Sequence, residues 1–328
     1  MGFRIKLALA VTAAVAVAVA VGIGTADAST RRHWWGGDRY PQPKPTASAS
    51  PAATRTTGAP APTAGASRTT SAPPSATRTA TPGTTAAGTF APPPANAGFD
   101  YQIGGPYTPP AGVGVVSRDH DASPAAGLYN ICYVNAFQAQ SEANSWWKSN
   151  HPELLLHDAK GNLVIDKDWN EILLDFSTDA KRAALTAIVG GWMDGCASKG
   201  FKGVEPDNLD SWTRSGGLLT KTQAVAYAQS LVAYGHGKGL AVGQKNTADL
   251  GAASARQIGF DFAVAEECAD YNECGDYTAV YGNHVIVIEY SQSQFTKACN
   301  SYGSTLSIVL RDVDVTTPGS GSYVFKTC

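Results

Sequence analysis

The sequence predicts an α/β fold: a (β/α)8 TIM-type barrel with one strand more than a barrel requires. Short apolar runs rich in β-branched residues recur along residues 98–328, and each run ends in a polar side chain. Helical stretches separate several of these runs, and such alternation is typical of a parallel sheet buried on both faces. No Gly-x-Gly-x-x-Gly motif follows any run, which argues against a dinucleotide-binding sheet.

Nine apolar runs are candidates for the eight strand positions. They cover residues 99–102, 113–119, 131–135, 172–175, 203–208, 240–246, 260–267, 285–290 and 307–312. We expect the surplus strand to be the first or the last of them. Because all strands of a barrel end at one face, the acids and amides at these ends are expected to gather there and carry the chemistry.

Two helices are well marked between the runs. Residues 179–199 place apolar side chains three and four residues apart on one face, with Ser177 or Thr178 as the N-cap. A second helix is predicted for residues 221–234 and ends in the glycine-rich segment 235–239. Trp146 and Trp147 are expected on a further helix, half in the core and half at the surface.

The ends of the chain differ in composition from its main part. Residues 1–28 combine a basic start, an apolar stretch and a small-residue cleavage site, which predicts a signal peptide. The apolar stretch is almost long enough to remain as a membrane anchor, but we favour cleavage and export to the cell exterior or surface. Residues 29–97 are rich in Pro, Ala, Thr and Ser and predict a disordered linker. Residues 98–328 are then one barrel-sized domain.

The predicted domain is acidic. Residues 98–328 hold 16 Lys and Arg against 25 Asp and Glu, whereas residues 1–97 hold 9 against 2. An acidic domain is a poor nucleic-acid binder and is suited to a cationic partner, although acidity also serves solubility. We expect a monomer that makes no membrane contact once the signal peptide is removed.

All six cysteines lie in the predicted domain. In an exported protein an even number predicts disulfides, and fifteen pairings are open. We favour Cys268–Cys274, which closes a short loop, and Cys299–Cys328, which ties down the C-terminus, so that Cys132 pairs with Cys196. No histidine lies at metal-ligand spacing from a cysteine, so no metal site is expected.

Carboxylates dominate the strand ends, and no nucleophilic serine motif or phosphate loop accompanies them. The acids there are Asp100, Asp119, Asp175, Glu205, Asp207, Glu266, Glu267 and Glu289. Hydrolysis of a glycosidic bond needs two carboxyl groups, one that protonates the leaving oxygen and one that stabilises the sugar cation or activates water. Like charges that share a site raise the pKa of one member and leave the other ionised.

Several segments of the domain resemble glycoside hydrolase family 114, whose members are endo-α-1,4-polygalactosaminidase-type enzymes on a barrel fold. They are residues 99–105 (FDYQIGG), 129–135 (YNICYVN), 204–210 (VEPDNLD), 243–246 (GQKN), 265–268 (AEEC) and 271–274 (YNEC). The resemblance implies that Asp207 is the nucleophile or stabilising carboxylate and that Glu266 is the general acid/base. Two alternatives stay open: Glu267 is the acid, or Asp207 only caps a turn.

The remaining strand-end residues are predicted to contact substrate. Asp100, Asp119 and Asp175 are candidates for binding the ammonium group of a galactosamine unit. Candidates for hydroxyl or ring contacts are Tyr133, Asn135, Gln244 and Glu289. Further candidates for substrate binding are Glu205, Asn208 and Glu267. Lys245 is expected to pair with a carboxylate and orient it. Among the tryptophans that offer a ring for stacking on sugars (Trp146, Trp147, Trp169 and Trp212), Trp212 is favoured.

The sequence therefore predicts an exported, endo-acting hydrolase of an α-1,4-linked galactosamine polymer that needs no metal or cofactor. One alternative keeps the barrel and changes the sugar, for example to a neutral α-galactoside. Another is a non-catalytic module that binds matrix polysaccharide and is displayed on the linker, and the presence of both Asp207 and Glu266 argues against it.

Overall fold

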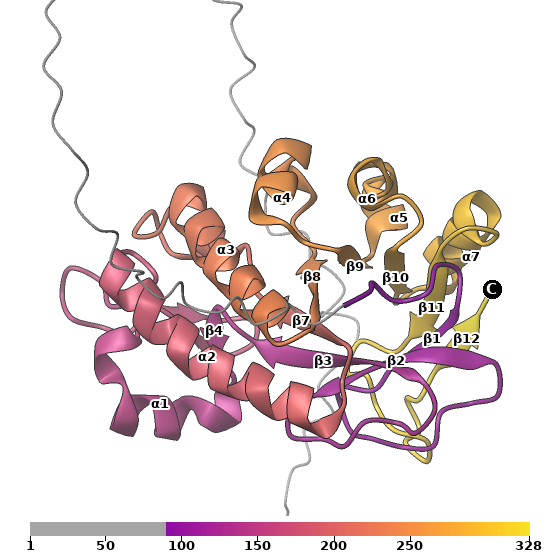
Figure 1. Ribbon diagram of the computed structural model, residues 1–328, viewed down its shortest axis with the longest axis horizontal. Helices are drawn as coiled ribbons and strands as arrows, with labels where there is room; N and C mark the ends of the chain where they lie inside the picture. Colours follow the sequence, from indigo (N-terminus) through magenta and orange to yellow (C-terminus); the bar gives the residue numbers. More distant parts are fainter. Residues whose placement is uncertain (1–89) are drawn as a thin grey trace, which may run out of the picture. The chain divides into compact units, whose positions relative to one another are not determined.

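The computed structural model describes residues 90–328, and eight parallel strands of this part form a nearly closed barrel (Figure 1). In spatial order they are β1 (Gly98–Tyr101), β2 (Val113–Asp119), β3 (Tyr129–Asn135), β7 (Gly203–Asp207), β8 (Ala241–Lys245), β9 (Phe262–Glu266), β10 (Val285–Glu289) and β11 (Ser307–Arg311). Strands β1 and β11 lie against each other, and β12 (Phe325–Thr327) adds an antiparallel edge to β11. The predicted fold class is confirmed.

The surplus run is 172–175, not the first or the last. It lies in a separate antiparallel sheet with the order β4 (Gln138–Ala139), β6 (Glu171–Leu173), β5 (Ile165–Asp166). Its apolar residues Ile172, Leu173 and Leu174 join the core outside the barrel, so burial on both sides made the run resemble a barrel strand. This small sheet belongs to the long connection between β3 and β7.

Among the barrel strands, β3 and each later strand up to β10 are followed by at least one helix before the next barrel strand. They are α1 (Asn144–Asn150), α2 (Asp179–Lys199), α3 (Lys221–Gly237), α4 (Ala252–Ile258), α5 (Cys268–Tyr271), α6 (Cys274–Tyr281) and α7 (Gln292–Tyr302), with 3-10 turns at Ser141–Ala143, Pro152–Leu154, Ser211–Arg214 and Ala248–Leu250. Thr178 caps α2, and a Thr220–Gln223 capping box begins α3, which runs three residues past its predicted end. Within residues 90–328, no helix combines the length and hydropathy needed to cross a bilayer.

The two faces of the barrel strands pack in two different apolar layers. One lies inside the barrel and includes Phe99, Tyr101, Val115, Ile131, Phe262, Val264, Ile286, Ile288 and Val309. The other lies between barrel and helices and includes Val204, Val242, Ala263, Val287 and Leu310. Successive side chains of a strand point to opposite faces, so the polar residues that continue the inner series face the barrel axis.

Residues 90–97 pack across the amino ends of the strands. The Phe90 ring stacks on His236 at 4.1 Å, the Tyr129 hydroxyl donates to the Ala91 carbonyl at 2.7 Å, and the Ala97 amide donates to Ser307 Oγ at 3.0 Å. These eight residues were assigned to the linker, but they belong to the folded part. The predicted signal peptide and the rest of the linker lie outside the described residues.

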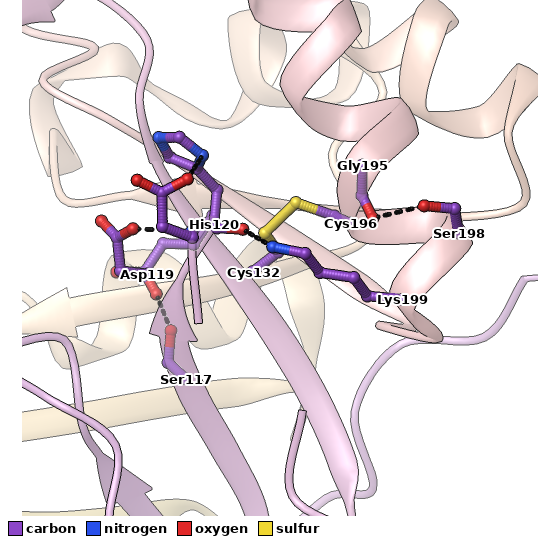
Figure 2. Close-up of a disulfide and its surroundings, with 10 residues drawn as sticks. Ser117, Asp119, His120, Cys132, Gly195, Cys196, Ser198 and Lys199 are labelled. Atoms are coloured by element: carbon purple, nitrogen blue, oxygen red, sulfur yellow. Dashed lines mark hydrogen bonds and ion pairs between the residues drawn. A yellow bond between two sulfur atoms is a disulfide. The ribbon is translucent and has the colours of Figure 1, made fainter. Parts of the chain in front are cut away.

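The structure confirms all three predicted disulfides, Cys132–Cys196, Cys268–Cys274 and Cys299–Cys328. Cys132 on β3 is bonded to Cys196 near the end of α2, and beside this bond Lys199 Nζ donates to the His120 carbonyl at 2.6 Å (Figure 2). The Cys268–Cys274 bond joins the starts of α5 and α6 directly after β9. It therefore braces the chain that follows Glu266.

Candidate active site

A buried lysine lies at the carboxyl end of the barrel and contacts three carboxylates. Lys245 Nζ is 3.2 Å from Glu205 Oε1, 3.4 Å from Asp207 Oδ2 and 3.3 Å from Glu266 Oε2. The lysine side chain is 2 % exposed. These residues end three adjacent parallel strands, β7, β8 and β9, so strand geometry alone brings them together.

Asp207 closes one side of this group. Its Oδ2 accepts a hydrogen bond from the Tyr133 hydroxyl at 2.9 Å, and its Oδ1 accepts from the backbone amide of Asn208 at 2.8 Å. Asn208 adopts a left-handed conformation with φ of 66°, which turns the chain at the end of β7. The Asp207 side chain is 11 % exposed. It is thus fixed in direction yet reachable.

Glu266 closes the other side. Its backbone amide donates to Asn246 Oδ1, and Asn246 Nδ2 donates back to Glu266 Oε2, both at 2.8 Å. The Tyr290 hydroxyl donates to Oε1 of the same carboxylate. With Lys245, three donors hold this carboxyl group, which is 4 % exposed.

Glu205 lies deeper in the barrel than Asp207, two residues before it on the same face of β7. It is fully buried, and its two oxygens accept from the Tyr101 hydroxyl at 3.0 Å and Ser117 Oγ at 2.7 Å. Burial raises the pKa of Glu205, and the ammonium of Lys245 only partly offsets this. Glu205 therefore lies buried against Lys245 below the end of the strand.

The charges of the group reinforce one another. Burial alone would lower the pKa of Lys245, but the carboxylates of Asp207, Glu266 and Glu205 outweigh it and raise that pKa well above the ordinary value. Burial and the nearby carboxylates raise the pKa values of Tyr101, Tyr133 and Tyr290 well above that of free tyrosine. The tyrosines therefore stay protonated and donate hydrogen bonds.

Asp207 at the end of β7 and Glu266 at the end of β9 form a carboxylate pair on either side of β8. Glycoside hydrolysis needs such a pair, and comparison with known proteins identifies the family. The model of glycoside-hydrolase family GH114 matches residues 78–328. The chain belongs to this family. It is therefore a glycoside hydrolase.

One solved structure supports the barrel fold of this hydrolase, and a second is reported as a weaker similarity. Aspergillus fumigatus Ega3 in complex with galactosamine has a TM-score of 0.60 at 21 % identity, covering 75 % of this chain and 100 % of that chain. The glycoside hydrolase domain of Pseudomonas aeruginosa PelA has a TM-score of 0.46 at 13 % identity, covering 70 % and 97 %. A comparison with curated proteins gives no match.

Polar side chains linked by hydrogen bonds lie next to Asp207 in the hydrolase. Asn208 Nδ2 donates to Asn135 Oδ1 at 3.0 Å, and Asn135 Nδ2 donates to Glu171 Oε2 at 2.8 Å. Arg214 holds Asn208 Oδ1 at 3.2 Å and is itself paired with Asp210. Asn135 and Asn208, both predicted site residues, thus lie beside Asp207.

Five predicted contact residues lie elsewhere or point away. Asp100 is fully buried against Arg311, and Asp175 pairs with Lys181. Gln244 accepts from the Tyr281 hydroxyl at 2.6 Å, and Glu289 accepts from the Ala269 amide at 2.9 Å, so both face the helices. Asp119 accepts from the Asp121 amide at 2.8 Å in the turn near the Cys132–Cys196 disulfide (Figure 2). These side chains hold the scaffold.

Glu267 is next to Glu266 in the chain but lies outside the contacts of Lys245. It adopts a left-handed conformation with φ of 56° at the point where β9 ends. Burial and the charge of Glu266 raise the pKa of Glu267 to about 7.

Sequence reasoning missed five residues of the site: Tyr101, Ser117, Glu171, Asn246 and Tyr290. Strand alternation offered a signal for two of them. Tyr101 follows Phe99 on the inner face of β1, and Tyr290 follows Ile288 on the inner face of β10. The acids beside them, Asp100 and Glu289, attracted the prediction although they occupy the outer face. Glu171 had no such signal, because it lies at the beginning of a strand outside the barrel.

Proposed function

We propose that this hydrolase cuts α-1,4-linked galactosamine polymer at internal bonds, with Asp207 as nucleophile and Glu266 as general acid/base. The observation that supports this most is the joint contact of Lys245 with both carboxylates. The galactosamine bound to the structurally similar Ega3 also supports an amino-sugar substrate. We further propose that the chain acts outside the cell, which three disulfides favour.

The spacing of the two carboxylates supports retention of configuration. Lys245 Nζ lies 3.4 Å from Asp207 Oδ2 and 3.3 Å from Glu266 Oε2. The distance between these two oxygens therefore cannot exceed the sum of the two contacts. Retaining enzymes separate their carboxyl groups by about 5 to 5.5 Å, and inverting enzymes by about 6.5 to 9.5 Å. This maximum separation of the two oxygens lies at the lower end of the inverting range.

The proposed reaction has two steps. Asp207 attacks the anomeric carbon as Glu266 gives its proton to the leaving glycosidic oxygen, which produces a glycosyl ester on Asp207. Glu266 then takes a proton from water, and the resulting hydroxide cleaves the ester. Glu266 must carry a proton for the first step. We propose that the ammonium group of Lys245 then moves away from Glu266 and toward Glu205 and Asp207, which it already contacts.

Reducing-end release tests this function. Wild type is expected to release ends from deacetylated α-1,4-galactosamine polymer, while Asp207→Asn and Glu266→Gln lose the activity, the latter by about 10²- to 10⁴-fold. Glu267→Gln is the matched control, because it removes a neighbouring acid and should keep most of the turnover. Loss of activity in Glu267→Gln with retention in Glu266→Gln would reverse the assignment of the acid. Absence of release by wild type would contradict the proposed substrate.

A further inference from the structure

One carboxylate beside Asp207 forms no ion pair with any cation of residues 90–328. Glu171 Oε2 accepts hydrogen bonds from Asn135 Nδ2 at 2.8 Å and Asn208 Nδ2 at 3.4 Å. Asn208 is the residue after Asp207, and Asn135 pairs with Asp207 across β3 and β7. Glu171 therefore lies next to the carboxylate that receives the anomeric carbon in the proposed reaction.

The small sheet places Glu171 there. Strands β5 and β6 form a hairpin in which Glu171 pairs with Asp166, and Asn170 at the turn has φ of 56°. Strand β4 begins three residues after β3 ends, which ties this hairpin to the barrel. The acid thus comes from a rigid element and not from a free loop.

The cations near Glu171 are engaged by other acids. Lys245 contacts Glu205, Asp207 and Glu266, whereas Arg214 contacts Asp166 and Asp210. Within residues 90–328, Glu171 accepts hydrogen bonds from amides only, and these reach one of its two oxygens. Burial, together with the charges of Asp207, Asp166 and Glu142, raises the pKa of Glu171 to about 8 although Asn135 lowers it. A carboxyl group held in this way gains from an incoming cation.

We propose that Glu171 binds the ammonium group of the galactosamine unit whose anomeric carbon faces Asp207, and so selects the free amine. This inference rests on the proposed function. In a 2-amino sugar the nitrogen is attached to the carbon next to the anomeric carbon, so it arrives beside Asp207. There the free Oε1 of Glu171 accepts a charge-assisted hydrogen bond. An acetylated nitrogen carries no charge and gives Glu171 no such partner.

Binding and turnover of Glu171→Gln test the proposal. On deacetylated polymer we expect kcat/KM to fall about 10- to 100-fold, mainly through KM, which corresponds to the loss of one hydrogen bond between charged groups. Glu153→Gln is the matched control, because it removes an exposed acid from the same β3–β7 connection and should change nothing. On acetylated polymer the two variants should equal wild type. An unchanged preference of Glu171→Gln for the deacetylated polymer would overturn the inference while leaving the hydrolase function intact.

Calorimetry with free galactosamine and galactose tests the role of Glu171 in amine binding separately from the proposed hydrolase function, because it needs no turnover. Wild type and Glu153→Gln should bind galactosamine more tightly than galactose, and Glu171→Gln should lose that difference. Equal galactosamine affinity in Glu171→Gln and wild type overturns the role of Glu171, whatever the polymer assay shows.

Stability against pH distinguishes binding from a structural role. The pKa of Glu171 is raised to about 8 in the folded state, so ionised Glu171 destabilises the fold relative to protonated Glu171. The stability of the wild type is therefore fully present at acidic pH and falls as pH rises through about 8. Glu171→Gln removes this loss, so the unfolding temperature of the free variant should exceed that of wild type at pH 9 and approach it at pH 5. A lower unfolding temperature of the variant at both pH values would mark Glu171 as structural and overturn the proposal.

Discussion

Two buried charged groups in the barrel differ in how their charges are balanced. At the carboxyl ends of β7, β8 and β9, Lys245 alone faces three carboxylates. At the seam between β1 and β11, Arg311 lies within 3.3 Å of the Asp100 carboxylate, and both are fully buried. The first group sets one cation against three acids, whereas in the second Arg311 faces Asp100 and, at 3.7 Å, the carboxylate of Asp312.

The seam group has partners from both backbone and side chains. Arg311 Nε donates to the Val324 carbonyl at 2.9 Å, and its Nη2 donates to the Thr316 carbonyl at 2.7 Å. Asp100 accepts from the Tyr107 hydroxyl at 2.9 Å. Arg311 therefore closes the barrel where the strand ladder is interrupted. The Lys245 group instead keeps carboxyl oxygens near the surface, and an unbalanced charge of this kind is typical of a site that awaits a ligand.

The Lys245→Met variant should break the comparison most strongly. Removal of one partner from a buried ion pair costs about 3 to 5 kcal/mol, and here three acids lose their shared cation. The three carboxylates then repel one another with no cation between them, so Asp207 and Glu266 should lose the positions that Lys245 gives them. We expect a lower unfolding temperature and a fall in kcat of about 10²- to 10³-fold, as when a preorganised donor is lost. A folded variant with wild-type kcat would show that Lys245 serves stability alone.

Arg311→Met is the matching change in the seam group. We expect a loss of stability of about 3 to 5 kcal/mol, measured by denaturant unfolding, because Asp100 keeps only neutral donors. Turnover of the folded enzyme should not change, since Arg311 contacts neither Asp207 nor Glu266. A fall in kcat at a temperature where the variant is folded would contradict the division between the two groups.

A pair of tyrosine changes sharpens the comparison with a smaller effect. Tyr290 and Tyr107 each donate a hydroxyl to an acid, Glu266 and Asp100 respectively. Each phenylalanine variant loses one hydrogen bond to a charged group, worth about 1.5 to 3 kcal/mol. Tyr290→Phe should lower kcat/KM, because Glu266 loses a donor that holds its carboxyl group in place. Tyr107→Phe should lower the unfolding temperature only. Equal kinetic effects of the two variants would remove the distinction.

Prediction from the sequence succeeded where a local rule decides the outcome. Thr178 caps the helix that ends at Lys199, and eight of the nine apolar runs became barrel strands, with Asp207, Lys245 and Glu266 at the ends of three of them. It failed where two faces had to be told apart. Asp100, Gln244 and Glu289 also end strands, but each points to the outer face, because side chains alternate along a strand.

The amino-acid sequence by itself predicted the class of fold from hydrophobic period and favoured the three cysteine pairs that the structure confirms. The two acids of the proposed reaction came from the resemblance of short motifs to a known family. Only the tertiary structure decided that Lys245 joins the two acids, that Tyr290 and Asn246 hold Glu266, and that Glu171 lies beside Asp207. Those contacts join residues from different strands and sheets, so their distances arise from packing and cannot be read along the chain.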